Sequence, residues 1–493
     1  MSLSEKPSDS IGKKTTQNIG WNYLSFGLSK ALSLLIISIL AHILPPENFG
    51  LVALATLAID YLSVVGDLGL GSALVQLRGN IDEASDTVFS INLITGLGLS
   101  TLTFIVAPFA ATFFREPELV PVLRWLGLSF TLSAIGAVHN VRLQRALNFR
   151  RKLIPDLGNS IIKGIISITM ALSGFGVWSL VIGQLVGGGI ASLLLWVVVP
   201  WRPRLHIRPD LAGKLFSFGL VIMLNNALAI LGDSFDYLVI GRVFNTAALG
   251  VYTLAYRLPE LLVINTLWVM TAVLFPAFSE IQSDIEMLRT NFLKVIRYVE
   301  MIVVPLCLGM VVAADPIIRV FFGEQWLEAI PIMRVLSLYA LVTSIGFHVG
   351  DVYKAIGRPD ILLKIAIPVF SIRILALWIG AQYSLLGVAI AHLVSTVIEV
   401  TIRLTVATRI VKISPRAILA QLRALLAGAA LIVFALGALF IMRSAQPIFQ
   451  LIFIIFAGAT GYILAISQLE KEILQPIFAY ASNLFTPKGT EGA

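Results

Sequence analysis

Five basic residues lie inside predominantly apolar segments of the chain. They are Lys30, Arg124, Lys163, Arg334 and Arg373. A charge at the centre of a bilayer costs at least about 2.5–3.5 kcal/mol, so a basic residue in a membrane-spanning segment indicates a function by default. The planar, permanently charged guanidinium group of arginine suits phosphate. These residues therefore predict that an anionic group is bound within a membrane.

Polar side chains recur beside Lys30 at the spacing of one helix face. They comprise Asn18, Asn22, Ser25, Ser29 and Ser33, at steps of three or four residues. Such a stripe on a membrane helix faces a cavity or another helix. Close helix packing is the alternative for the serines, because small residues allow backbones to approach. Packing does not explain an ammonium group in mid-membrane, so we expect Lys30 to line a cavity.

A second polar stripe lies about 200 residues later. It contains Asn225, Asn226, Asp233 and Asp236, and the spacing places each asparagine on one face with an aspartate. The stripe predicts a second cavity wall that carries carboxylates. Asp233 and Asp236 either form a buried ion pair with a neighbouring arginine or couple transport to H⁺ or Na⁺.

Arg124 and Arg334 each lie one or two turns inside one end of their segments, at equivalent places in an internal repeat. They either reach outward to lipid headgroups or point inward and bind an anion.

Other charges have an opposite charge at helical spacing, which favours mutual neutralisation. These pairs are Arg257 with Glu260, Asp351 with Lys354, and Glu399 with Arg403. Arg373 is less obviously paired.

Signatures of an enzyme or a cofactor site are missing from the sequence. The GxxxxGK[ST], HExxH and GxSxG motifs do not occur, and Cys307 is the only cysteine. His139 and His348 end equivalent segments without metal-like spacing, so we expect helix-end hydrogen bonds there. The sequence predicts no catalytic residue, no metal and no cofactor.

The composition requires a lipid environment to position these residues. Hydrophobic residues make up 57% and charged residues 13% of the 493 residues, against about 25% charged in soluble domains. A bilayer core needs about 20 helical residues, and lipid cannot satisfy irregular backbone. We therefore predict an all-α membrane protein with fourteen spans: 18–44, 48–77, 86–114, 118–141, 153–174, 176–200, 213–242, 247–279, 290–314, 327–355, 360–381, 385–410, 416–442 and 447–468.

The distribution of lysine and arginine predicts the orientation. Of the 36 basic residues, 26 fall on the side of the N-terminus. The opposite side has four, which are Arg115, Arg242, Arg319 and Arg443. By the positive-inside rule we expect both termini in the cytoplasm. The net charge of +8 then faces anionic lipid and does not indicate nucleic acid.

The chain repeats itself at an offset of about 200 to 211 residues. Gly50 aligns with Gly250, the FFRE of Phe113–Glu116 aligns with the FFGE of Phe321–Glu324, and Gly176 aligns with Gly387. Six spans per copy give both copies the same orientation, so we expect two parallel six-helix lobes followed by two extra helices.

This repeat sets the predicted domain boundaries. They are a cytoplasmic segment 1–17, an N-lobe 18–200, a cytoplasmic linker 201–212, a C-lobe 213–412, two further helices in 413–470, and a cytoplasmic tail 471–493.

Two stretches carry a family resemblance. The PPENFGLVALA of Pro45–Ala55 with the GDLGLGSALVQ of Gly66–Gln76, and the stretch Asp233–Leu262, resemble Wzx-like polysaccharide transporters near the colanic-acid-type exporters. These belong to the multidrug/oligosaccharidyl-lipid/polysaccharide superfamily. The resemblance covers about residues 15–470, and its motifs reflect packing and turns rather than catalysis.

The resemblance implies a flippase with a central cavity that opens alternately to each side. Its expected substrate is an undecaprenyl-diphosphate-linked oligosaccharide repeat unit, moved across the bacterial inner membrane for surface polysaccharide. Membrane lipids, a polysaccharide polymerase and H⁺ or Na⁺ are the candidate partners.

Three alternatives remain open at this point. A multidrug/cation antiporter of the superfamily usually has twelve spans and an acidic cavity, and a lipid II flippase has fourteen spans. A membrane polymerase or ligase would need a long loop with catalytic residues, and no predicted loop exceeds about fifteen residues.

Overall fold

The computed structural model describes residues 27–66, 68–76, 80–146, 148–213, 215–216, 223, 232 and 234–471, and these residues are helical apart from short connections. Six residues of the predicted polar stripes lie outside them, namely Asn18, Asn22, Ser25, Asn225, Asn226 and Asp233. The chain divides into two compact units, Met1–Thr253 and Leu254–Ala493. The predicted lobe boundaries remain a prediction.

Within the described ranges, ten helices are long and apolar enough to cross a membrane. They are Ile81–Phe114, Leu119–Arg145, Val177–Val198, Thr246–Glu280, Ile285–Phe321, Ala329–Ala355, Asp360–Tyr383, Leu385–Ile410, Pro415–Ile441 and Pro447–Leu469. This confirms an all-helical membrane protein.

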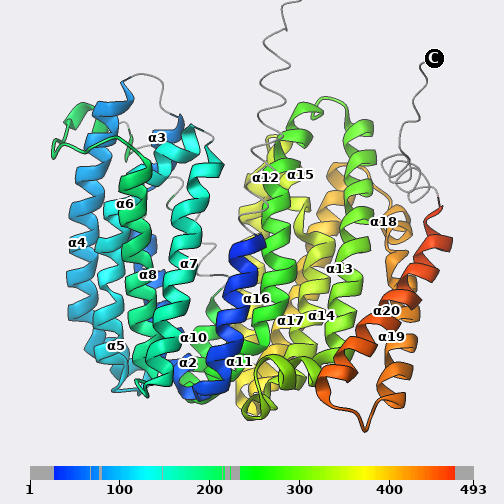
Figure 1. Ribbon diagram of the computed structural model, residues 1–493. Helices are drawn as coiled ribbons and strands as arrows, with labels where there is room; N and C mark the ends of the chain where they lie inside the picture. Colours follow the sequence, from blue (N-terminus) through cyan, green and yellow to red (C-terminus); the bar gives the residue numbers. More distant parts are fainter. Residues whose placement is uncertain are drawn as a thin grey trace, which may run out of the picture. The chain divides into compact units, whose positions relative to one another are not determined.

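The first unit is a bundle in which α4, α6, α7 and α8 run side by side (Figure 1). Its helices are Gly27–Ile43, α2 (Pro46–Gly66), α3 (Leu70–Gln76), α4 (Ile81–Phe114), α5 (Leu119–Leu126), α6 (Leu128–Arg145), α7 (Phe149–Leu172), α8 (Val177–Val198), α10 (Phe235–Val243) and the start of α11 (Thr246–Pro259).

The starts of α2 and α11 approach each other backbone to backbone. A side chain on Gly50 would collide with the carbonyl group of Thr246, and one on Gly250 would collide with that of Pro46. Only glycine permits this reciprocal approach. The glycine pair that the repeat aligns is thus a packing contact between equivalent helix starts.

The segment 201–212 binds along the first turns of α4. The backbone amide of Arg204 donates to Asp86 Oδ1 at 2.9 Å, and the Arg208 guanidinium binds Glu83 Oε2 at 2.5 Å. The Arg208 guanidinium also holds the pKa of Asp210 below its usual value through a hydrogen bond. Basic residues of this segment are thereby fixed to α4.

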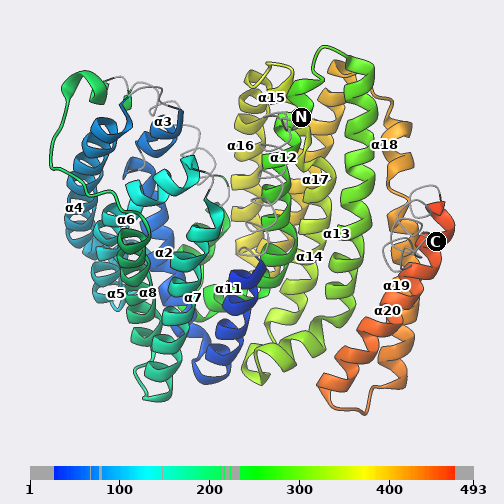
Figure 2. The ribbon, with the colours of Figure 1, turned by 45° about the horizontal axis from the view of Figure 1, so that its top comes forward.

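The second unit contains a longer bundle, with α19 and α20 packed against α13 (Figure 2). Its helices are the end of α11, the π-helix η1 (Glu260–Ile264), α12 (Asn265–Glu280), α13 (Ile285–Phe321), the 3₁₀ turn η2 (Glu324–Trp326), α14 (Ala329–Phe347), α15 (Val349–Ala355), α16 (Asp360–Tyr383), α17 (Leu385–Ile410), α18 (Pro415–Gln421), α19 (Ala424–Ile441) and α20 (Pro447–Leu469).

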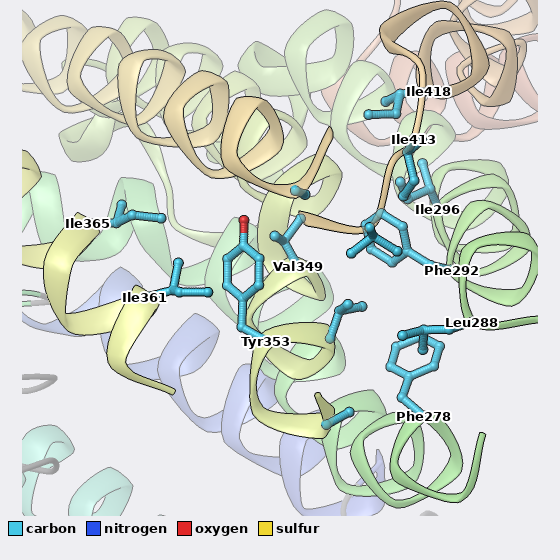
Figure 3. Packing of buried hydrophobic residues seen from close by; sticks show 14 of the residues in the cluster. Phe278, Leu288, Phe292, Ile296, Val349, Tyr353, Ile361, Ile365, Ile413 and Ile418 are labelled. Atoms are coloured by element: carbon cyan, nitrogen blue, oxygen red, sulfur yellow. The ribbon is translucent and has the colours of Figure 1, made fainter. Parts of the chain in front are cut away.

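An apolar cluster closes one end of the second unit, and Figure 3 shows Tyr353 of α15 at its centre. Phe278 and Phe292 pack there from α12 and α13, and Ile361 packs from α16. The Tyr353 hydroxyl donates to the Arg403 carbonyl at 2.7 Å, which satisfies the one polar atom of this side chain.

Two pairs of equivalent helices in the two units share a type of cap or a length. Asn80 caps α4 by accepting from the Glu83 amide, and Asp284 caps α13 by accepting from the Met287 amide. Helices α7 and α16 each contain 24 residues. The start of α4 and α13 and the length of α7 and α16 are thus consistent with the repeat seen in the sequence.

Candidate functional site

Lys30 and Lys163 lie on two helices of the first unit that pack side by side. Gly164 of α7 leaves room for Ile36 of the helix Gly27–Ile43, and Leu40 and Ala171 join the same contact further along. The order of these contacts makes the helices parallel. Because Ile36 lies level with Gly164, Lys30 lies level with a point five residues before Lys163. At a rise of 1.5 Å per residue, the two lysines are therefore roughly 8 Å apart along the helix axis. Both side chains are half-buried.

Glycines of α8 allow a close approach to α7 at Lys163. A side chain on Gly187 would meet Lys163 Cβ at 2.9 Å and Asn159 Oδ1 at 2.6 Å. A side chain on Gly183 would collide with Ser167 Oγ. The glycine run of α8 therefore brings its backbone against the polar face of α7.

Sequence reasoning singled out Lys163 but missed the polar face around it. Asp156, Asn159, Lys163 and Ser167 follow one another at steps of three, four and four residues, which places them on one face of α7. The same spacing rule that identified the stripe beside Lys30 could have found them. Ser167 Oγ and Ser29 Oγ are buried, and neither has a hydrogen-bond partner among the described residues.

The side chain of Arg124, on α5, contacts helix α4. Its Nε donates to the Phe104 carbonyl at 3.3 Å, and its guanidinium lies 4.1 Å from the centre of the Phe104 ring. Arg334, its counterpart on α14, is exposed. Both the headgroup interpretation and the anion interpretation of these two residues stay predictions.

Arg373 is ion-paired, and the interpretation that it lacks a clear partner was wrong. Its guanidinium binds Glu399, which also binds Arg403. The Arg373 and Glu399 side chains are 12% and 14% exposed. Sequence reasoning missed the pair because the two residues are on different helices, α16 and α17.

The three pairs predicted at helical spacing are confirmed. Arg257 binds Glu260 at 3.2 Å, and Lys354 lies 3.7 Å from Asp351. Arg403 binds Glu399, as described for Arg373.

Asp236 is buried at the start of α10 and is bound by neutral donors. The Tyr252 hydroxyl donates to its Oδ2 at 2.8 Å, and the Tyr237 amide donates to its Oδ1 at 2.9 Å. Tyr61 of α2 donates to the adjacent Ser234 carbonyl at 3.4 Å. These tyrosines connect α2, α10 and α11 around the carboxylate. An ion-coupling role for Asp236 stays a prediction.

The two equivalent histidines differ. His348 lies 3.0 Å from Asp351 Oδ2, which also accepts from Thr271 Oγ1 at 3.0 Å, so the predicted helix-end hydrogen bond is confirmed there. The His139 ring instead stacks on Trp196, with ring centres 4.9 Å apart, and a helix-end hydrogen bond of His139 stays a prediction.

A small cavity of about 130 Å³ opens where α4, α10 and α11 meet in the first unit. Arg115, Glu116 and Arg242 are among the residues that line it. Burial and the neighbouring Glu118 raise the pKa of Glu116 above its usual value. The Arg242 guanidinium lies 5.5 Å from the centre of the Phe113 ring.

None of the sequence patterns singles out Glu300 of α13. Its side chain is fully buried, and Ser344 Oγ of α14 lies 2.7 Å from its Oε1. It was missed because a single acidic residue in an apolar segment has no spacing signal.

The family model described as polysaccharide biosynthesis protein matches residues 39–331. The chain belongs to this family. Its similarity to curated relatives extends further. It is 26% identical to the lipopolysaccharide biosynthesis protein WzxC of Escherichia coli over 79% of this chain and 80% of that protein. It is 31% identical to the succinoglycan biosynthesis transport protein ExoT of Rhizobium meliloti over 66% of each chain.

Two kinds of solved structure share the fold. The inward closed conformation of the lipid II flippase MurJ is similar over 92% of this chain and 99% of that chain, with a TM-score of 0.69 at 18% identity. An inward-facing multidrug resistance transporter of the MATE family is similar over 78% of this chain and 94% of that chain, with a TM-score of 0.65 at 19% identity.

These similarities define the class of the protein. It is a multi-pass membrane protein of the polysaccharide biosynthesis transporter and flippase family, and it is not an enzyme. Its fold is that of the multidrug and lipid II transporters.

Proposed function

We propose that this protein moves an undecaprenyl-diphosphate-linked oligosaccharide repeat unit across the bacterial inner membrane for surface polysaccharide synthesis. The family and the succinoglycan transport relative support a carbohydrate cargo. Both termini are proposed to lie in the cytoplasm, because 26 of the 36 basic residues fall on that side of the predicted spans.

The observation that carries the proposal is the placement of Lys30 and Lys163. Two half-buried lysines on parallel, adjacent helices can approach one diphosphate from two levels of the membrane. An ammonium group attracts a phosphate more strongly in a low-dielectric site than in water. Polar atoms of Asn159, Ser29 and Ser167 lie on the same helices, and hydroxyl and amide groups can bind a sugar.

The proposed transporter has fourteen membrane spans, arranged as two parallel six-helix lobes and two extra helices. The lobes would open a cationic central cavity alternately to the two sides of the membrane. The sugar crosses inside this cavity while the lipid tail stays in the bilayer. Arg124 and Arg334 are proposed to contact the cargo near the side of the membrane opposite to the termini.

The test uses a strain that lacks the chromosomal gene and carries plasmid copies of variants. Lys30→Ala and Lys163→Ala should each lower surface polysaccharide by about tenfold or more, because each removes a cation that a buried diphosphate requires. Lipid-linked oligosaccharide should accumulate inside the cell. Lys163→Arg should retain more export than Lys163→Ala, because it keeps the charge.

Lys152→Ala is the matched control, because Lys152 is in the first turn of the same helix, α7. It should export normally. Normal export by both alanine variants, at normal protein level, contradicts the cationic site. A wild-type gene that restores drug resistance or peptidoglycan precursor transport, but not surface polysaccharide, contradicts the proposed cargo.

A further inference from the structure

Glu300 lies in the middle of α13 with no exposed surface. Its Oε1 is 2.7 Å from Ser344 Oγ, and its Oε2 has no hydrogen-bond partner among the residues that the structure describes. An ionised carboxylate without a cation costs several kcal/mol at such a site. Burial alone therefore favours the neutral acid.

The hydrogen bonds of Ser344 favour the same state. Ser344 Oγ lies 2.7 Å from Glu300 Oε1 and also 2.7 Å from the Leu341 carbonyl oxygen. A hydroxyl group has a single proton to donate. Both contacts are full hydrogen bonds, with no proton shared between two acceptors, when Ser344 donates to Leu341 and Glu300 donates its own proton to Ser344. The geometry therefore fits a protonated glutamic acid.

The extra helices α19 and α20 enclose this site. The Tyr462 hydroxyl of α20 donates to the Met301 carbonyl at 2.8 Å, and Gly428 of α19 leaves room for Val304 and Leu308. These contacts cover the face of α13 next to Glu300. The two helices beyond the repeat thus help to bury the carboxyl group.

The charged groups near Glu300 are engaged elsewhere. Arg297, three residues earlier on α13, binds Glu470 at the end of α20. Glu260 of η1 binds Arg257. Arg334 of α14 is exposed and lies ten residues from Ser344 along the helix. Along α13 itself the remaining ionisable side chains are the pairs Glu286–Arg289 and Asp315–Arg319 with Lys294, Tyr298 and Cys307. On the adjoining helices they are Tyr339 of α14, Tyr462 of α20 and Arg416 of α18, while α19 has none.

We propose that Glu300 is a proton-binding site, and that its proton is exchanged during the transport cycle to drive export. The use of the proton in transport rests on the proposed function, whereas the proton-binding site does not. A metal cation would need several oxygen ligands, and within the described ranges no group of three ionisable metal ligands occurs. A proton needs only the single hydroxyl that Ser344 provides.

The direct test is infrared difference spectroscopy of the purified full-length protein at neutral pH. The carbonyl stretch of a protonated carboxylic acid should disappear in Glu300→Gln. The matched control Glu286→Gln, an exposed residue of the same helix that binds Arg289, should leave that band unchanged. If Glu300→Gln instead removes a carboxylate band, Glu300 is ionised and the proton site is wrong.

A second arm tests the use of the proton. Glu300→Gln preserves shape and fixes a neutral side chain, so it should fold normally and lower surface polysaccharide by about tenfold or more. Export at the wild-type level overturns the coupling role even if the acid band is present. A wild-type protein that exports no polysaccharide refutes the proposed function, while the infrared result decides the proton site independently.

Discussion

Helices α7 and α16 occupy equivalent places in the two units, and each carries a cation near its middle. Lys163 is the fifteenth residue of α7, and Arg373 is the fourteenth residue of α16. The neighbouring helices differ at the position of Glu399. Aligning Gly176 with Gly387 places Gly188 of α8 opposite Glu399 of α17 in the alignment. In the second unit Glu399 binds Arg373.

This difference shows how a duplicated scaffold separates two roles. The 24-residue length of α7 and α16 is kept, whereas the carboxylate on the adjoining helix is not. A carboxylate at Glu399 turns the intramembrane arginine into part of a structural ion pair. The aligned residue in the first unit is the uncharged Gly188, while the close approach of α8 to α7 is at Gly183 and Gly187. We propose that the cargo binds in the first unit.

The largest effect is expected from removing the carboxylate of the second unit. Glu399→Ala removes the carboxylate that Arg373 and the half-buried Arg403 share, which should cost about 3 kcal/mol in the free energy of unfolding. Thermal unfolding in detergent measures this. The double variant Arg373→Leu with Glu399→Leu should be more stable than Glu399→Ala and should still export polysaccharide. Loss of export by the double variant at normal protein level would make Arg373 a cargo residue and remove the contrast.

The second largest effect is expected from introducing a carboxylate into the first unit, at the position that aligns with Glu399. A Cβ on Gly188 would meet no atom within 4 Å, so a larger side chain fits there. Gly188→Glu should neutralise Lys163 and lower surface polysaccharide by about tenfold. Gly188→Gln has almost the same shape without the charge and should export near the wild-type level. Equal losses in both variants would mean that size, and not charge, matters at this position.

The smallest effect is expected at an exposed ion pair on the protein surface. Arg142 binds Asp82 at 2.7 Å, with the Asp82 side chain 70% exposed. Arg142→Ala should change the free energy of unfolding by no more than about 1 kcal/mol and leave export unchanged. A loss similar to that of Glu399→Ala would show that exposure does not separate the two classes of ion pair.

Features that depend on neighbouring residues of the chain, such as helix positions and ion pairs within one helix turn, could be predicted from the sequence. Hydropathy alone placed the helix at 385–410, and the structure has α17 at Leu385–Ile410. The pair Arg257–Glu260 was predictable because both residues share one helix turn. The pair Arg373–Glu399 was not, because it depends on how α16 and α17 are rotated against each other.

Long-range packing explains the remaining omissions. Glu300 is buried partly by α20, whose Tyr462 is 161 residues away from its contact at Met301. His139 stacks on Trp196 from another helix, so helix-end chemistry could not predict its surroundings. No periodicity within one segment contains such information.

The most direct test of the central claim is the affinity of the purified protein for undecaprenyl diphosphate, the carrier without its sugar, measured by titration in lipid nanodiscs. If the first unit binds the diphosphate, the double variant Lys30→Ala with Lys163→Ala should weaken binding by about tenfold or more. Arg373→Leu with Glu399→Leu should bind as the wild type does. The opposite pattern, with unchanged affinity in the lysine variant and weak binding in the second-unit variant, would contradict the assignment of cargo binding to the first unit.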